Sequence, residues 1–357
     1  MKTLIKITLI SLVLGILLPD SMKAQDAHFS QFYNNPLYYN PAFSGLNLGL
    51  KARMHYKRQW ANIPGDFHNY NFSADIADRN MPGSGGLGFI INNDRRGIGY
   101  LQTMTIGLAP SVRIPLASNF VMQAAPLLSY VRKEVNWEKM IFSGQLDDIQ
   151  GNVNPSTFTP PSDNALSYPD FGFGILFQVH GDNTIATFGA SGYHLTEPNQ
   201  SFFEESAPLA RRYVGHGDIV FNIGDYKGYF KRKVSFKLNP GVVYMQQADM
   251  TLYSVGINMY IRNVYLGLWY KNESLEYDTY SDVSGMAGLM IPMNSNTRMK
   301  IMYSYDMQVN ASFAFAGPTH EITLLFEFDN LKLVSERGGS SFRGRQIIEE
   351  TLECSPF

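Results

Sequence analysis

Hydrophobic and polar residues alternate over long stretches of the chain, for example in residues 233–239, 251–262, 298–306 and 320–328. A repeat of two residues is the pattern of a β-strand, because successive side chains point to opposite faces. These stretches are longer than the five to six residues usual in soluble sandwiches, and they suit strands of about ten residues that cross a membrane at a tilt. The alternation therefore favours a membrane barrel over a soluble β-sandwich.

Fourteen such segments follow one another along the chain. An even number of strands is expected for a bacterial barrel made from a single chain. The predicted strands span residues 47–60, 67–78, 85–93, 99–114, 119–135, 168–180, 184–195, 211–225, 231–246, 250–261, 264–272, 281–292, 297–307 and 318–329.

The connections between the predicted strands alternate in length. Tight turns at residues such as 181–183 and 262–263 belong to one set, and the two longest connections, 136–167 and 196–210, belong to the other. Short turns on one side and long loops on the other are typical of outer-membrane barrels. We therefore predict an all-β, integral outer-membrane barrel of fourteen antiparallel strands, residues 47–329, with both termini in the periplasm.

The three tryptophans fall near the outer ends of strands that run outward: Trp60, Trp137 and Trp269. Aromatic side chains form girdles at the two membrane interfaces of such barrels. We predict that these tryptophans belong to the outer girdle, although Trp269 lies on the face that can point inward.

The beginning of the chain has the layout of a secretory signal peptide. Lys2 and Lys6 form a basic region, residues 7–18 are largely apolar, and Ala24 offers a small residue for cleavage. An uncleaved membrane anchor is the alternative, but the apolar stretch is short for a spanning helix. We assign residues 1–24 to a signal peptide, so the mature protein has left the cytoplasm.

Composition removes several classes of function. The formal net charge of −2 gives no reason to expect nucleic acid as a partner. Cys354 is the only cysteine, so an intramolecular disulfide is impossible. After the signal peptide no run of eighteen apolar residues occurs, and no transmembrane helix is predicted.

Between the signal peptide and the first strand, residues 29–45 read FSQFYNNPLYYNPAFSG. The prolines exclude a central strand, and the aromatic content is too high for an idle disordered leader. Residues 25–46 either fold into the lumen as a plug, lie against the periplasmic mouth as a docking surface, or form a latch over the first strand. The candidate plug or latch residues are Phe32, Tyr33, Asn34, Pro36, Tyr38, Tyr39, Asn40 and Pro41.

This aromatic block, followed by RMHYKRQW at residues 53–60 and by Pro64, resembles the start of the PorP/SprF family of type IX secretion proteins of Bacteroidetes. FSGQLDD at residues 142–148 and THEITLLFEF at residues 319–328 are similar to further family segments. The terminal CSPF resembles the family's Cys-Pro-aromatic ending, with one serine inserted. The likeness spans the mature chain.

The resemblance implies a non-enzymatic outer-membrane protein without cofactors or metals. Members of the family are implicated in secretion or surface retention of a cognate cargo protein, in some cases an adhesin of gliding motility. The partners that the resemblance implies are a secreted cargo at the cell surface, periplasmic lipoprotein or ring components, and outer-membrane lipid.

A tail of residues 330–357 follows the last predicted strand and is expected in the periplasm. GGSS and RGR segments read as a flexible linker, and RQIIEETLE is predicted to form one short helix with an apolar stripe, which would need a partner surface. The tail either docks on a periplasmic component or is a frayed end, and we favour docking. Cys354 can pair with another protein's thiol, pack as a small apolar residue, or do neither. The docking candidates are Ile347, Ile348, Leu352, Cys354 and Phe357.

Signals for catalysis or metal binding are weak. The seven histidines are scattered singly, without the spacing of a metal site. GSGGLG at residues 83–88 runs into a predicted strand and is interpreted as a turn instead of a dinucleotide cradle. A hydrolase assembled at the barrel rim is a distant alternative. Asp147, Asp148 and Asp163 are interpreted as solvated loop charges in preference to a cation site.

Basic residues on faces that can line the lumen raise a rival function, a passive porin for small solutes with a preference for anions. An ordinary polar lumen in which bases pair with acids of neighbouring strands explains the same residues, and we prefer that interpretation. The residues concerned are Lys233, Lys237, Arg298 and Lys300.

Overall fold

The structure is a computed structural model of the chain. It describes residues 25–77, 84–98, 101–147, 151–152, 155–156, 158–161, 163–203, 205–227, 233–274, 279–294, 296–309 and 315–329. The assigned signal peptide, Asp148 and the predicted tail of residues 330–357, including its docking candidates, therefore lie outside the described residues.

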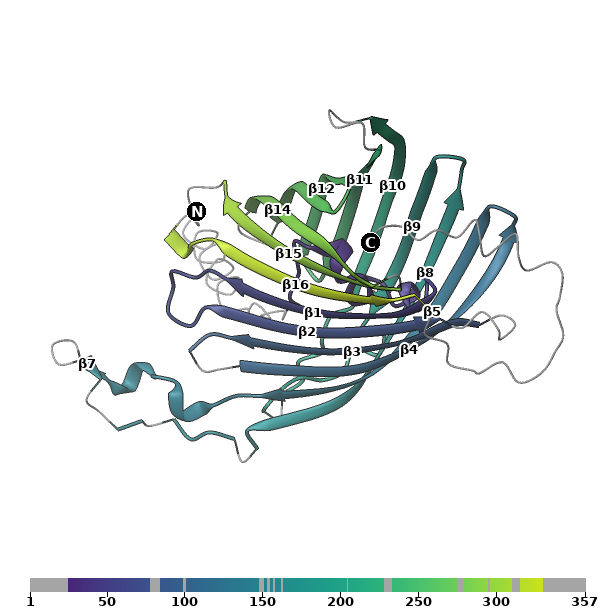
Figure 1. The fold of residues 1–357 in the computed structure, drawn as a ribbon. Coiled ribbons are helices and arrows are strands. Elements are labelled where there is room, and N and C mark those ends of the chain that lie inside the picture. Colours follow the sequence, from purple (N-terminus) through teal and green to yellow (C-terminus); the bar gives the residue numbers. More distant parts are fainter. Residues whose placement is uncertain are drawn as a thin grey trace, which may run out of the picture.

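Antiparallel strands close into one barrel of fourteen strands (Figure 1), as predicted. The first and last strands, β1 and β16, pair from Leu50 opposite Phe328 to Arg58 opposite His320 and complete the ring. The wall consists of β1 (Gly49–Gln59), β2 (Phe67–Ala77), β3 (Ser84–Arg96), β4 (Leu101–Ala117), β5 (Phe120–Glu134), β8 (Ala165–His180), β9 (Thr184–Tyr193), β10 (Arg212–Lys227), β11 (Lys233–Gln247), β12 (Met250–Ile261), β13 (Val264–Ser274), β14 (Thr279–Asn294), β15 (Thr297–Gln308) and β16 (Thr319–Phe328).

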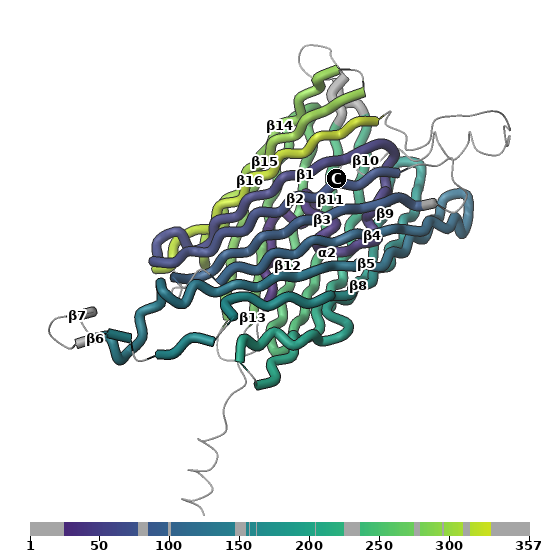
Figure 2. The backbone as a smooth tube through the Cα atoms, turned by 90° about the horizontal axis from the view of Figure 1, so that it is seen from below, coloured from purple at the N-terminus to yellow at the C-terminus, as the bar shows by residue number. Residues whose placement is uncertain are grey.

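Several short helices and a small hairpin do not belong to the barrel wall. Among the described residues no helix has the length and apolar character needed to cross a membrane. The hairpin β6–β7 lies away from the wall (Figure 2), within the connection between β5 and β8. The elements are η1 (Phe32–Asn34), α2 (Pro36–Tyr39), η2 (Pro41–Phe43), η3 (Trp137–Lys139), η4 (Ser143–Gln145), β6 (Leu146–Asp147) and β7 (Gly151–Asn152).

The two ends of the barrel differ in their connections. The short-turn end carries the turns 118–119, 181–183 and 262–263, and it is also where β1 begins and β16 ends. The long-loop end carries the connections 135–164 and 194–211.

Alternation divides each strand between lipid and lumen. In β12, Tyr253, Val255 and Ile257 are exposed on the outer face, while Leu252 and Asn258 are buried on the inner face. An apolar outer face and a mixed, largely polar inner face are the arrangement required of a barrel that spans a bilayer.

Tyrosines predominate among the outward aromatic side chains in the half of the wall nearer the long-loop end. Each of these tyrosines is exposed and lies in the half of its strand nearer the long-loop end. Phenol rings with an apolar body and a polar tip suit the membrane interface. These tyrosines are Tyr70, Tyr130, Tyr213, Tyr244, Tyr253, Tyr270, Tyr303 and Tyr305.

The prediction that the three tryptophans form this girdle is wrong. Trp269 has the inward parity of β13, is 3% exposed, and donates its indole N–H to Asn258 Oδ1 at 2.8 Å. Gly256 on β12 makes room for its ring, since a Cβ there would lie 2.3 Å from Trp269 Cδ2. Trp60 follows β1 and packs on Phe67, and Trp137 belongs to η3 in a loop.

An arginine at the outward position Leu268, near the middle of β13, tests the lipid-facing assignment. Leu268 is 59% exposed, so Leu268→Arg places a charge in hydrocarbon and is expected to cost about 2–4 kcal/mol of unfolding free energy. Urea unfolding of the barrel folded in phospholipid vesicles measures this cost. The matched control is Ile98→Arg, at a similarly exposed position in a connection at the long-loop end. Equal costs in the two variants would contradict the assignment.

Candidate functional site

Residues 25–46, here called the N-terminal segment, lie inside the barrel (Figure 1). From residue 28 to residue 46 every side chain is buried except Phe43, which is half-buried. Prolines at 36 and 41 occupy first helical positions, where a missing N–H costs nothing. Over residues 32–43 the helical turns are short, namely η1, α2 and η2, and they let the chain follow the lumen. All eight predicted plug or latch residues lie in this buried stretch.

The segment runs along the barrel from one end to the other. Near the long-loop end, Arg96 Nη1 donates to Gln25 O at 2.8 Å and Asp26 N donates to Gln247 Oε1 at 2.8 Å. At the short-turn end the chain enters β1 at Gly49. Gln25 therefore lies at the opposite end from Asp329, whereas we predicted both termini on one side. The chain has to cross the lumen before its first strand begins, which the strand count alone does not show.

Backbone groups of the segment satisfy a buried carboxylate on the inner face of β16, near the long-loop end of that strand. Glu321 Oε1 accepts from Ser30 N at 2.9 Å and Oε2 accepts from Gln31 N at 3.0 Å. His55 Nε2 lies 3.3 Å from Oε2, and the Ser30 hydroxyl donates to Asp306. Because an unpaired buried charge is costly, the wall depends here on the segment.

Other charges of the inner wall pair between neighbouring strands. Lys271 Nζ lies 2.7 Å from Asp282 Oδ2, and Lys51 Nζ lies 3.1 Å from Glu327 Oε1. Each of these four side chains is buried. The polar inner face is thus a network of paired ions, which the segment completes.

The four basic residues proposed for the lumen have different surroundings. Lys300 is buried, donates to Asn34 Oδ1 at 3.1 Å and stacks over Tyr265 at 4.8 Å from the ring centre. Arg298 is partly exposed at the short-turn end and lies 3.0 Å from Asp329 Oδ1. Lys237 is half-buried, and the side chain of Lys233 is outside the description.

Glycines on the inner wall form seats for the segment. A Cβ on Gly174 of β8 would lie 2.0 Å from Asn40 Oδ1 and 2.8 Å from Pro41 Cδ. A Cβ on Gly189 of β9 would lie 2.8 Å from Asn40 Nδ2. The Asn40 amide uses this space to donate to Ile175 O at 3.0 Å. The wall is therefore shaped to the residue that it holds.

Aromatic rings fill the space between these polar contacts. Phe32 packs edge-on against Tyr33 and Tyr39, with ring centres 4.6 and 4.7 Å apart. The ring of Tyr33 in turn packs against the ring of Trp269 in β13, with ring centres 5.3 Å apart. The Tyr39 hydroxyl donates to Phe29 O at 2.7 Å, so its polar tip is satisfied within the segment. These rings make the core of the barrel interior.

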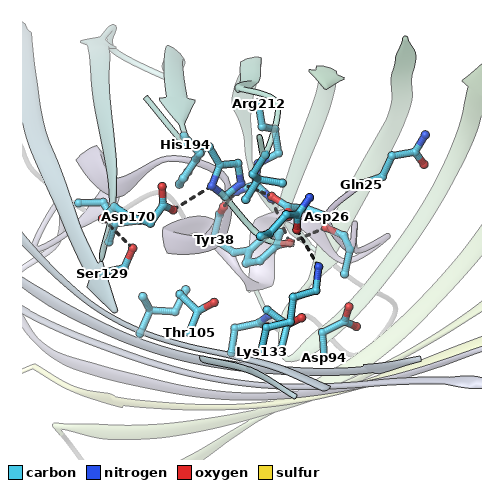
Figure 3. A pocket seen from close by; sticks show the side chains of 18 of the residues that line it. Gln25, Asp26, Tyr38, Asp94, Thr105, Ser129, Lys133, Asp170, His194 and Arg212 are labelled. Carbon is cyan, nitrogen blue, oxygen red and sulfur yellow. Dashed lines mark hydrogen bonds and ion pairs between the residues drawn. The ribbon is translucent and has the colours of Figure 1, made fainter. Parts of the chain in front are cut away.

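Ion pairs hold the start of the segment at the long-loop end. Asp26 Oδ2 lies 2.7 Å from His194 Nε2 and 3.0 Å from Arg212 Nη1. His194 Nδ1 contacts Asp170 Oδ2 at 2.9 Å (Figure 3). The Arg212 guanidinium also stacks over Tyr38, 4.7 Å from the ring centre. We call Asp26, His194, Arg212 and Asp170 the lumen lock.

The charges of the lumen lock shift the protonation of two groups that lie outside the strands. Burial alone raises the pKa of Asp26, but His194 and Arg212 outweigh it and hold this pKa well below its usual range. Burial lowers the pKa of His194, while Asp26 and Asp170 outweigh that effect and raise it to about 9. At neutral pH the pair is therefore an ion pair.

A cavity of about 270 Å³ lies beside the lock (Figure 3). Its walls combine apolar side chains such as Leu37 and Leu127 with polar groups such as Thr105 and Ser129. Neither the lock nor the cavity was predicted from the sequence. Asp26 and His194 are 168 positions apart and carry no local motif.

The weaker sequence signals stay outside this site. In the described part of the chain no group of three or more His, Cys, Asp or Glu side chains is arranged to hold a metal ion. The interpretation of GSGGLG as a turn is wrong, because residues 84–88 belong to β3, which begins at Ser84. His320 and Glu321 face opposite sides of β16, since Glu321 is buried inside and His320 bonds outside to Tyr303 at 2.8 Å.

Comparison with known families gives one match. The model of a family described as "Type IX secretion system membrane protein PorP/SprF" matches residues 21–326. Among the curated proteins compared, none matches the chain.

Comparison with solved structures gives distant barrels. A FadL homologue of Pseudomonas aeruginosa has 10% identity and a TM-score of 0.44, covering 83% of this chain and 94% of its own. The CymD monoaromatic hydrocarbon channel has 9% identity and a TM-score of 0.43, covering 83% and 92%. The toluene transporter TodX of Pseudomonas putida has 10% identity and a TM-score of 0.42, covering 86% and 95%. Likeness at this level carries no argument about function.

Filling a glycine seat tests the fit of the segment. In Gly174→Ala the new methyl group collides with Asn40 and Pro41, and overpacking of this kind costs about 1–3 kcal/mol. We expect lower unfolding free energy and faster protease cleavage within residues 25–46. Gly285→Ala on β14 is the control, because a Cβ there meets nothing within 4 Å. Unchanged protease resistance in Gly174→Ala would show that the segment is not seated there.

The lumen lock predicts a dependence of stability on pH. The pKa of His194 is raised from 6.5 to about 9. Its contribution to the unfolding free energy is therefore complete below about pH 6.5 and is lost as the pH rises through about 9. The pKa of Asp26 is lowered, so its contribution to the unfolding free energy is present at every pH above the ordinary pKa of an aspartate. That contribution is lost only in strong acid. We expect urea unfolding free energy to fall between pH 7 and pH 10 by on the order of 1–3 kcal/mol more in wild type than in His194→Gln. Equal losses would refute the lock.

Proposed function

Because the chain belongs to the PorP/SprF family of type IX secretion system membrane proteins, we propose that this integral outer-membrane barrel receives or anchors a cognate secreted cargo protein and couples to periplasmic components of the machinery. The family and the barrel fold point to a secretion component and not to an enzyme. The proposal therefore assigns binding roles only.

The occupied lumen is the observation that carries the proposal. The N-terminal segment contacts β8 and β9 through Asn40, β16 through Ser30 and Gln31, and β10 through Asp26. A porin needs a continuous aqueous path, and here buried aromatic rings stand in that path. The filled interior favours a barrel that works through its ends over the alternative of a passive small-solute channel.

The two ends offer different surfaces for the proposed partners. Long loops of outer-membrane barrels face the outside, so the connections 135–164 and 194–211 are the proposed region of cargo contact. The short-turn end then faces the periplasm, where residues 330–357 would emerge. We keep Ile347, Ile348 and Leu352 as the candidate apolar stripe for docking there, with Cys354 and Phe357 beyond it. A gliding adhesin is one class of cargo that fits this role.

Co-purification from gently solubilised outer membranes tests the proposal. We expect the tagged full-length chain to retain a large secreted protein together with periplasmic lipoproteins. A chain ending at Asp329 should keep the secreted protein and lose the periplasmic set. The matched control is the full-length chain with Ile347→Asp and Ile348→Asp, which keeps the tail length and removes only the apolar stripe.

Two results would count against the proposal. If the barrel purifies without a secreted protein in every preparation, the proposed cargo role is wrong. Loss of the periplasmic set in the truncated chain but not in the double variant would place docking elsewhere in the tail.

A further inference from the structure

The cavity beside the lumen lock is a binding site that the proposed function does not yet use. It lies at the long-loop end, because Gln200 and Leu209 of the connection 194–211 line it. Arg96 and Lys133, at the long-loop ends of β3 and β5, complete its lining. Asp26 and Tyr38 of the N-terminal segment form another part of its wall, so a group that arrives from the side of the long loops meets the cavity where the segment begins.

The size of the cavity suits one large side chain. Pockets that enclose drug-sized ligands have about 300–1,000 Å³, and this cavity has about 270 Å³. Leu37, Ile90 and Leu127 give it apolar walls, and all three are buried. Protein interfaces commonly place a single aromatic anchor in a pocket of this kind.

One wall group lacks a hydrogen bond that a ligand can supply. Asp170 is 3% exposed and its Oδ2 is engaged by His194. Its Oδ1 is buried and accepts no hydrogen bond from the described residues. A buried carboxylate oxygen without a donor is unfavourable, so an occupant with an N–H or O–H group on its edge gains a contact here.

The charges around the cavity select against a cationic occupant. Its lining contains the carboxylates of Asp26, Asp94 and Asp170 and the basic groups of Arg96, Lys133, Arg212 and His194. With His194 protonated in its ion pair, the positive groups are in excess. A lysine or arginine side chain is therefore repelled, whereas a neutral donor is not.

We infer that this cavity holds one aromatic side chain with a hydrogen-bond donor on its edge, an indole or a phenol, carried by a polypeptide that approaches from the long-loop end. The inference rests on the proposed function, in which that polypeptide is the cargo. Apolar walls take the ring, Asp170 Oδ1 accepts from its N–H or O–H, and the positive surroundings exclude cationic anchors.

Binding of small probes to the purified full-length barrel tests the inference without the cargo. The probe is N-acetyl-tryptophanamide, followed by ligand-observed NMR in detergent micelles. We expect saturable binding that N-acetyl-tyrosinamide displaces and that N-acetyl-lysinamide and N-acetyl-leucinamide do not. The naphthylalanine analogue, which has a ring but no N–H, should bind about tenfold more weakly, because Asp170 Oδ1 then stays unpaired.

A pair of variants on one strand locates the site. Thr105 lines the cavity, so Thr105→Trp fills it and should weaken probe binding by about tenfold or more. Met104, the preceding residue, is 36% exposed on the outer face, and Met104→Trp should leave binding unchanged. Equal binding to both variants, or equal binding of the leucine and tryptophan probes, would overturn the inference.

Cargo co-purification with the same variants separates this inference from the proposed function. Loss of cargo with Thr105→Trp, and retention with Met104→Trp, supports both. If wild type and Thr105→Trp retain cargo equally while only the probe is lost, the cavity is not the cargo contact and the inference fails. If the wild-type barrel binds the probe but never retains cargo, the proposed function fails instead.

Discussion

The charged inner face of a closed barrel has to be satisfied from within, and the rest of this structure depends on that constraint. A strand that alternates between lipid and lumen places every second side chain inside the wall, and in this chain many of those buried side chains are ionisable, such as Lys57, Lys271 and Glu321. Ions buried without partners are strongly destabilising. Pairs between neighbouring strands meet part of the need, and backbone N–H groups of the N-terminal segment meet the rest at Glu321.

The segment is held differently at its two ends, and this difference bears on function. Toward its C-terminal end the segment is held by shape, since Asn40 fits between Gly174 and Gly189, about midway along β8 and β9. Near the long-loop end it is held by charge, through Asp26 and its partners. Shape contacts resist displacement at any pH, whereas ion pairs depend on protonation. The end proposed to meet the cargo is therefore the end whose hold on the segment responds to its chemical environment.

The alternating pattern was enough to predict the wall, because a strand that faces lipid must repeat every two residues. The contacts inside the barrel were harder to predict, because inward side chains pack against and bind residues that are distant in sequence. Trp269 was assigned to the girdle from its position along a strand, but the parity of β13 turns it inward. The aromatic block at residues 29–45 showed that the segment was unusual. It did not show the direction of the chain through the lumen, because that depends on contacts such as Asp26 with Gln247, 221 positions away.

The lumen cavity could not be predicted for the same reason. It is formed where the start of the N-terminal segment leaves space beside β3, β4, β5, β8 and β9, and no local motif marks its walls. Single-channel recording in planar bilayers tests the occupied lumen most directly. The full-length barrel is compared with a chain that lacks residues 25–46. Conductance steps from this shortened chain would show that the barrel inserts into the bilayer. A lumen filled by the segment predicts no stable open steps from the full-length barrel, and stable steps of equal size from both chains would contradict it.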